Sequence, residues 1–352
     1  MGAAQHLKLH PLSEIEDSMK KSKWKRKLGK FYGMLGNGII GFFDIFLGSI
    51  QKLIGLKGIP YLFVLPNLLI FGIFILYPML LNFFYAFTGG TAFFPEGRPY
   101  VGTANFERIL ACENYLQPNT CQEDLFWRSV YNTIFYVVIQ VVLLILVSLV
   151  TALILNRNIK WRGFFRSVFF YPNLLSPIVV GLIWQWILMS DGVLNGILMN
   201  LGFDRIPFLV NANWARFWVI MVSVWASMGF YTLILLAGLQ SIPSDLYEAA
   251  SIDGASKWKA LINITLPLLM PTMIVAIVLA LIRAVQVFEI VFAFTGGGPG
   301  TATMFLVQYI YNYGFTSPNR QFGVAAAASL LMAGVLVVLT LMQLAAKREE
   351  SY

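Results

Sequence analysis

The sequence is poor in charge, in histidine and in cysteine. Only 12% of its 352 residues are charged, whereas 58% are hydrophobic, and the mean hydropathy is +0.71. This balance is unlike that of a soluble domain of the same length, so we expect most of the chain to lie in lipid. The two histidines lie in the polar N-terminal tail, and no histidine or cysteine cluster has the spacing of a metal site. We therefore expect neither a catalytic metal nor covalent chemistry.

A phosphate-binding loop is also missing, since the pattern Gly-x-x-x-x-Gly-Lys-Ser/Thr does not occur. The glycine-rich stretch from Gly296 to Gly300 has no lysine after it and is typical of a surface turn. The sequence thus predicts no nucleotide and no cofactor bound by this chain.

Long hydrophobic runs dominate what is present. A run of about 20 apolar residues can cross a hydrocarbon core about 30 Å thick, and six such runs occur. They lie near Tyr61 to Tyr85, Val130 to Leu155, Phe165 to Leu188, Phe217 to Leu239, Leu268 to Phe288 and Val324 to Leu344. The predicted fold class is an all-α integral membrane protein with about six transmembrane helices. The predicted organisation is a tail and interfacial segment at 1–59, a membrane domain at 60–345 with loops at 86–128 and 241–266, and a tail at 346–352.

The positive charges indicate the topology. The net charge is +8, and the Lys and Arg residues gather in the tail from Lys20 to Lys30 and in short connections, such as the one from Arg157 to Arg162. Because cytoplasmic loops are enriched in Lys and Arg, we expect both termini to be cytoplasmic, and we expect no nucleic-acid partner. The segment from Phe31 to Leu56 is apolar but broken by glycines and polar residues, which indicates an in-plane interfacial helix. A further span is the alternative.

Both cysteines lie in the loop at 86–128. If this loop is exported, Cys112 and Cys121 meet an oxidising compartment and can form a short disulfide staple. Two free thiols are the other possibility.

The connection at 241–266 has the pattern of a bent helical elbow. Ser244 is placed to cap a first short helix, Gly254 allows a left-handed turn, and Ser256 is placed to cap a second helix. Pro267 then suits the first turn of the fifth span. Such an elbow protrudes toward the cytoplasm, where a groove on a soluble partner can hold it.

This elbow resembles the EAA motif of ATP-binding-cassette importer permeases. The motif reads Glu-Ala-Ala, three residues, Gly, nine residues, Ile-x-Leu-Pro. The matching residues here, with the acidic residue before the glycine, are Glu248, Ala249, Ala250, Asp253, Gly254, Ile264, Leu266 and Pro267. The resemblance covers roughly Tyr61 to Leu344 and looks most like the carbohydrate-uptake, maltose-transporter-like permeases.

The resemblance implies a function and a set of partners. It implies a permease subunit in the bacterial cytoplasmic membrane whose elbow is a coupling helix that docks on an ATPase subunit. The implied partners are a second homologous permease, two ATPase subunits that bind ATP and Mg, and an external solute-binding protein. The implied solute is a sugar or a sugar-like molecule, such as an oligosaccharide, a glycosylated osmolyte, a polyol or a glycerol phosphate. The alternative is an ion-driven secondary transporter, which inverted repeats and ionisable residues at the membrane midplane would indicate.

Ionisable residues inside spans are functional candidates by default, and Arg283 is the main one here. Counted from Pro267, it lies about 24 Å along a core of about 30 Å, toward the outer side. Gln286 shares its helix face, so the two could bind solute hydroxyls or an anionic group, whereas Glu289 is expected to point away. An ion pair with the partner permease is an equally weighted role for Arg283.

Aromatic residues are the second group of candidates, because sugar rings present apolar C–H faces. Trp184, Trp225 and Tyr231 could line a solute path, and Gly229 could leave room for a ligand. Tryptophans near span ends are also common as interface anchors, which is the interpretation favoured for Trp186.

Overall fold

A computed structural model describes residues 55, 57 and 59–349 of the chain. In this part every regular element is a helix, and pairing of extended residues is limited to two isolated bridges, Thr88 with Tyr100 and Cys112 with Cys121. The all-α prediction is thus confirmed. Apart from Gly55, the predicted interfacial segment Phe31 to Leu56 lies outside the described residues, as does the basic tail from Lys20 to Lys30.

Six helical segments of the described chain are long and apolar enough to cross a membrane, as predicted. They are Pro60–Ala86, Asp124–Asn156, Pro177–Asn200, Ala212–Gln240, Lys257–Val285 and Phe322–Leu341.

The described residues divide between Met79 and Leu80 into two compact units. The first contains α2 (Ile59–Phe71), the π-helical turn η1 (Gly72–Leu76) and the start of α3 (Tyr77–Ala86). Its side chains are apolar all round and exposed; Phe74, for example, is 72% exposed. A helix that is apolar on every side needs lipid or another chain around it.

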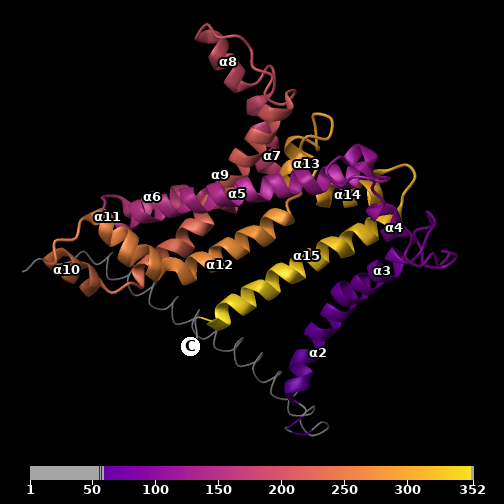
Figure 1. The fold of residues 1–352 in the computed structure, drawn as a ribbon, viewed down its shortest axis with the longest axis horizontal. Helices are drawn as coiled ribbons and strands as arrows, with labels where there is room; N and C mark the ends of the chain where they lie inside the picture. Colours follow the sequence, from indigo (N-terminus) through magenta and orange to yellow (C-terminus); the bar gives the residue numbers. More distant parts are fainter. Residues whose placement is uncertain (1–54, 56, 58, 350–352) are drawn as a thin grey trace, which may run out of the picture. The chain divides into compact units, whose positions relative to one another are not determined.

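The core of the second unit forms where α5 (Asp124–Asn156), α9 (Ala212–Gln240) and α12 (Leu266–Val285) pack together. Leu144, Leu235 and Ala280 are among the buried residues of this core. Figure 1 shows these helices with α15 (Phe322–Glu349) as the longest rods of the unit. They carry the membrane-spanning part of this unit and position the residues considered below.

The third predicted span is wrong in its boundaries. The chain between Phe165 and Leu188 is not one helix, because α6 (Arg162–Phe170) passes into the 3-10 turn η3 (Tyr171–Leu174) and breaks before α7 (Pro177–Leu188). Pro177 explains the break, since proline has no N–H to donate and the residue before it, Ser176, lies outside the helical region. In Figure 1, α7 and α8 (Val193–Asn200) turn away from the direction of α6.

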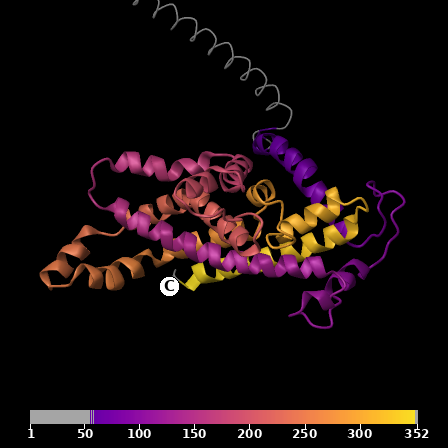
Figure 2. The same ribbon diagram turned by 90° about the horizontal axis from the view of Figure 1, so that it is seen from above.

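At the end of this unit opposite α10, the 86–128 loop packs on the residues that follow α13 (Glu289–Phe294) (Figure 2). We call residues 86–128 and 301–322 the cap lobe. It contains α4 (Ala104–Leu110), η2 (Pro118–Thr120), α14 (Leu306–Tyr311) and η5 (Asn312–Thr316). A disulfide joins Cys112 and Cys121 in this lobe.

Candidate functional site

The elbow is built from two short helices joined by a sharp turn. Helix α10 (Ser244–Ile252) is followed by Gly254 at φ +72°, a left-handed conformation that glycine adopts without steric cost. The Ser256 side chain then accepts a hydrogen bond from the Lys259 N–H and caps α11 (Lys257–Ala260). The elbow lies at one end of the unit, as Figures 1 and 2 both show.

One expected detail of the elbow is wrong. Ser244 does not cap α10: its hydroxyl contacts the Asp245 carboxylate at 3.3 Å, and Pro243 occupies the cap position. The helical segment runs without interruption from Lys257 to Val285, and Pro267 lies in the first turn of α12, as predicted. The π-helical turn η4 (Leu261–Thr265) lies directly before it and accommodates the missing proline N–H, since it already shifts the hydrogen-bond register.

One side-chain contact ties the two arms of the elbow together. The Tyr247 hydroxyl lies 3.0 Å from the hydroxyl of Thr265, which is buried at the base of the second arm. The first arm is therefore attached to the helix that continues as α12.

The outer surface of the elbow combines apolar and acidic side chains. Ile252 is 86% exposed and Trp258 68% exposed, and Glu248 is exposed on the same short helix as Ile252. Its acidic residues make no ion pair with any described residue. Large apolar side chains exposed beside unpaired charge are typical of a surface that contacts another protein.

A cavity of about 500 Å³ lies among α5, α9, α12 and the segments η3, α7 and α13. Helices α5 and α9 contribute Gln140, Ser223 and Tyr231 to its wall, and the end of α12 contributes Arg283. Its size is within the usual range for small-molecule sites.

Three polar atoms in the cavity wall are buried without a hydrogen-bond partner among the described residues. They are Gln140 Oε1, the Ser223 hydroxyl and the Tyr231 hydroxyl. A buried polar group without a partner is destabilising, by about 1–3 kcal/mol. Such groups are retained where a ligand or a water molecule supplies the missing hydrogen-bond partner, so this wall suits a ligand rich in hydroxyl groups.

The cavity also holds charge of both signs. The Arg283 guanidinium lies over the Phe230 ring, 4.6 Å from its centre, and Gln286 and Glu289 line the same cavity. The expectation that Glu289 points away is wrong, because α12 ends at Val285, before Glu289, and Glu289 lines the same cavity as Arg283. Arg283 and Glu289 form no ion pair with described residues, so both remain free to meet a ligand.

Three of the predicted path residues do not line this cavity. Trp184 packs between Trp218 and Trp225, with ring centres 5.8 and 5.6 Å away, so these rings contact one another. At Gly229 an added Cβ would clash with the Phe169 carbonyl oxygen, so this glycine allows α9 to pack closely against the backbone at Phe169. Gln140 and Ser223 were missed, although a glutamine within an apolar span was a signal for the first of them.

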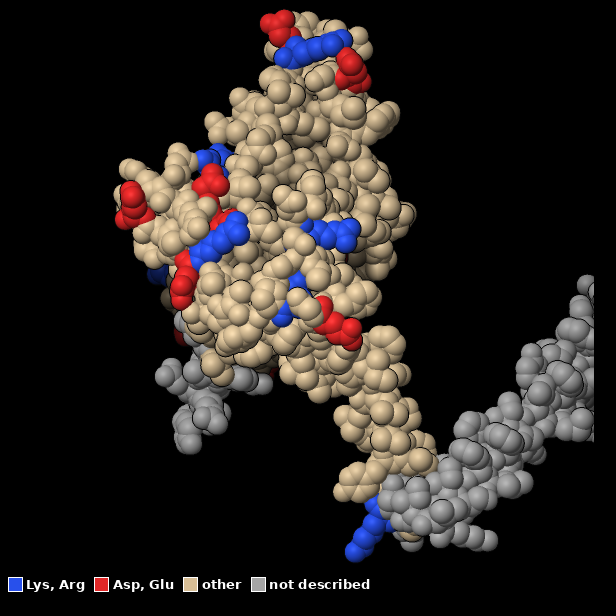
Figure 3. Space-filling view, turned by 90° about the vertical axis from the view of Figure 1, so that its right-hand side faces the viewer, with Lys and Arg blue, Asp and Glu red and all other residues tan. Residues whose placement is uncertain are grey.

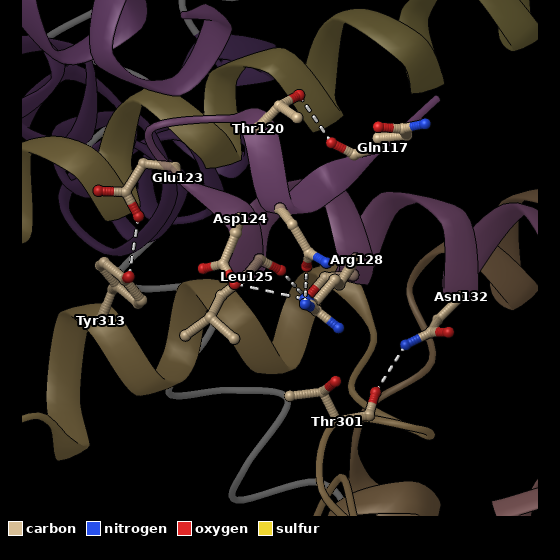
Figure 4. A network of polar contacts seen from close by, with 11 residues as sticks. Gln117, Thr120, Glu123, Asp124, Leu125, Arg128, Asn132, Thr301 and Tyr313 are labelled. Carbon is tan, nitrogen blue, oxygen red and sulfur yellow. Dashed lines mark hydrogen bonds and ion pairs between the residues drawn. The ribbon is translucent and has the colours of Figure 1, made fainter. Parts of the chain in front are cut away.

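The cap lobe has its own polar network, part of which Figure 4 shows, including the contact between Glu123 and Tyr313. Glu123 is 3% exposed, forms an ion pair with Arg108, and accepts hydrogen bonds from the hydroxyls of Tyr313 at 2.8 Å and Tyr309 at 3.2 Å. Burial, followed by the hydrogen bond to Glu123 and the charge of Glu123, raises the pKa of Tyr313 to about 12. In the same lobe the Asn132 amide donates to the Thr301 carbonyl at 2.7 Å. The network joins the start of α5 to the segment around α14.

The elbow and most of the cavity wall fall within one match to a known family. Its model, described as a binding-protein-dependent transport system inner membrane component, matches residues 144–351. The chain belongs to this family. It is therefore a transport permease subunit and a multi-pass membrane protein, as its six apolar helices indicate.

Relatives support the same placement of this permease. It is 36% identical over 285 residues to the trehalose/maltose transport system permease protein of Thermococcus litoralis, which covers 81% of this chain and 92% of that protein. A bacterial transporter for the acidic polysaccharide alginate contains a chain with a TM-score of 0.71 and 26% identity, covering 86% of the permease and 99% of that chain. The same kind of transporter, in complex with an alginate pentasaccharide-bound periplasmic protein, gives a TM-score of 0.64 at 25% identity over 83% and 95% of the two chains.

Proposed function

We propose that this permease is a membrane subunit of an ATP-driven importer for a sugar or a sugar-like solute, and that a separate ATPase supplies the energy. The elbow supports the coupling role, because it presents exposed apolar and acidic groups around the EAA residues. The Thermococcus litoralis relative, named for trehalose and maltose, and the structural neighbours, which import alginate, support the solute class.

The single observation that carries the solute site is the set of unpartnered polar atoms in the cavity wall. Gln140, Ser223 and Tyr231 offer one acceptor and two hydroxyls that have no partner within the described chain. Sugar hydroxyls both donate and accept, so one solute can satisfy all three. Arg283 and Glu289, at the cavity edge, add a charged donor and a charged acceptor.

The proposed partners are a second, homologous permease, two ATPase subunits that bind ATP and Mg, and an external solute-binding protein. A periplasmic protein is part of one complex that contains a neighbour of this fold. The distribution of Lys and Arg supports a topology with both termini in the cytoplasm, where the elbow meets the ATPases.

The continuous helical segment Lys257–Val285 offers a direct mechanical link between the two sites. It spans about 40 Å at 1.5 Å per residue, with the elbow at one end and Arg283, in the cavity wall, near the other. Closure of the ATPase subunits on ATP would move the elbow, and this rod would move the cavity wall with it. Solute would thereby be exposed alternately to the two sides.

Uptake by the complex in vesicles tests the proposed solute site. Tyr231→Phe and Ser223→Ala each remove one hydroxyl with little change in volume, and we expect each to raise the half-saturating solute concentration about tenfold, equivalent to about 1.4 kcal/mol. Thr232→Val is the matched control: Thr232 is the next residue on α9 and also has an unpartnered buried hydroxyl, but it does not line the cavity. Wild-type uptake by the Tyr231 and Ser223 double variant would show that the cavity is not part of the solute path. Uptake driven by a proton or sodium gradient without the ATPase would favour the secondary transporter.

A further inference from the structure

The turn between α5 and α6 carries positive charge without nearby negative charge in the sequence. Arg157, Lys160, Arg162 and Arg166 fall within ten residues, and no Asp or Glu occurs between Asp124 and Asp191. No carboxylate of a described residue forms an ion pair with any of these four side chains.

Two of these arginines converge on a single neutral atom. With the Gln240 amide oriented so that its oxygen faces them, Arg162 and Arg166 each donate from an Nη2 group to this oxygen, at 2.7 and 2.8 Å. The Nε atom of each guanidinium is buried and has no partner among the described residues. Two guanidinium groups that share one amide oxygen repel each other and keep unused donors, which is the arrangement that a phosphate oxygen completes best.

The same turn presents large apolar side chains to its surroundings. Trp161 is 76% exposed and lies at φ +66°, a left-handed conformation that is unfavourable for a bulky residue. The exposed ring of Phe164 lies edge-on to it, with centres 6.4 Å apart. Exposed tryptophan beside Arg and Lys at the end of a span is the composition of a membrane–water interface.

We propose that the α5–α6 turn and the first turns of α6 bind an anionic phospholipid. Its phosphate would replace or join the Gln240 oxygen between Arg162 and Arg166, while Trp161 and Phe164 lie among the glycerol and upper acyl groups. A lipid fits better than a protein carboxylate, because the cations and the apolar rings lie on one short segment at a span end. Lipids of the phosphatidylglycerol or cardiolipin class supply the negative charge that attracts these basic residues.

The site lies close to the coupling elbow along the chain. Gln240 is the last residue of α9, and α10 begins at Ser244, so a lipid that holds the two arginines also fixes the end of the helix that leads into the elbow. The inference concerns lipid binding only and does not depend on which solute the cavity takes.

Native mass spectrometry of the full chain with its co-purifying subunits tests this site. The complex is released from vesicles that contain phosphatidylcholine with or without phosphatidylglycerol, and retained lipid is counted. We expect Arg162→Gln/Arg166→Gln to reduce retained phosphatidylglycerol about tenfold, while phosphatidylcholine is unchanged. Lys257→Gln/Lys259→Gln is the matched control, because it removes two exposed charges at the same end of the unit and should leave retention unchanged.

Equal retention by the two double variants would overturn the proposal. Displacement of phosphatidylglycerol by soluble glycerophosphoglycerol or inorganic phosphate would assign the arginines to a soluble anion instead. Unchanged lipid retention together with loss of the ATPase subunit from the arginine variant would assign them to a protein contact.

A second measurement keeps the proposal testable if the arginine variant fails to fold. The fluorescence of Trp161 is obtained as the difference between wild type and Trp161→Phe. Phosphatidylglycerol with brominated acyl chains should quench this fluorescence more strongly than brominated phosphatidylcholine does. Equal quenching by the two lipids would show that Trp161 meets lipid without selectivity and would overturn the site.

Discussion

The cap lobe and the elbow, at opposite ends of the same unit, satisfy their polar and apolar groups in opposite ways. In the cap lobe, Glu123 is buried and has three partners within the chain, and a disulfide closes the neighbouring loop. On the elbow, Ile252 and Trp258 are exposed and Glu248 has no ionic partner among the described residues.

The surfaces at the two ends also differ in how their charged side chains are distributed. Figure 3 views the cap-lobe end, where basic and acidic side chains are interspersed and most of the surface is neither. At the elbow end, the acidic residues of α10 and the basic residues of α11 and of the α5–α6 turn form no ion pair with any described residue. The difference indicates that the cap lobe is complete within this chain, whereas the elbow end is completed by other molecules.

The largest expected effect comes from reversing a charge on the elbow. Glu248→Lys should lower solute uptake and solute-stimulated ATP hydrolysis at least tenfold, because it places a positive charge where the partner ATPase is proposed to bind. The variant should still insert into the membrane and keep its thermal stability, since Glu248 is exposed. The measurements are uptake into vesicles and ATPase activity of the complex.

The control for that change lies in the cap lobe. Glu96 is also exposed, and Glu96→Lys makes the same substitution at the other end of the unit. We expect wild-type uptake from this control. If both variants transport normally, the elbow has no coupling role. The exposed groups of the elbow that lack partners in the described chain would then not indicate a functional contact.

The next effect concerns stability, and it should be confined to the cap lobe. Cys112→Ser/Cys121→Ser opens a loop of about ten residues, for which the chain-entropy account gives a loss of about 2–3 kcal/mol. Hydrogen exchange should become faster around α4 and η2 and remain unchanged on α10. Faster exchange at both ends would mean that the cap lobe and the elbow unfold together, and that the disulfide does not stabilise the cap lobe alone. Wild-type chain treated with a reductant should behave like the double variant.

The helical spans were predictable from the sequence because lipid forces long apolar runs into helices. The third span was misplaced because the largely apolar sequence continues past the point at which Pro177 ends the helical hydrogen bonding of the backbone. The π-helical turn η4 directly before α12 was not predictable, because the hydrophobic pattern alone does not reveal such a turn.

The candidate site was predictable to the extent that its residues are adjacent in sequence. The elbow follows from the spacing of local caps and glycine, and the structure has the expected turn at Gly254. The cavity joins Gln140, Ser223 and Arg283 from three different helices, and only their packing brings these residues together. The tryptophans were the natural candidates for a sugar path, but the geometry of their contacts places them in an aromatic cluster.

The smallest expected effect is a pH dependence of the cap lobe. In the folded chain the pKa of Tyr313 is raised to about 12, above the usual value of about 10 for tyrosine in an unfolded chain. The stability that comes from neutral Tyr313 is therefore fully present below about pH 10 and is lost as the pH rises toward 12. Tyr313→Phe loses the hydrogen bond to Glu123, so its melting temperature should be lower than that of wild type at pH 9. Because phenylalanine cannot ionise, the melting temperature of the variant should fall less steeply between pH 10 and 12.

Thermal melts of the two proteins across this range provide the measurement, with hydrogen exchange on α10 as the reference that should not differ between them. Parallel slopes would mean that the carboxylate network does not hold Tyr313 neutral, and the cap lobe would then owe its integrity to the disulfide and to apolar packing alone.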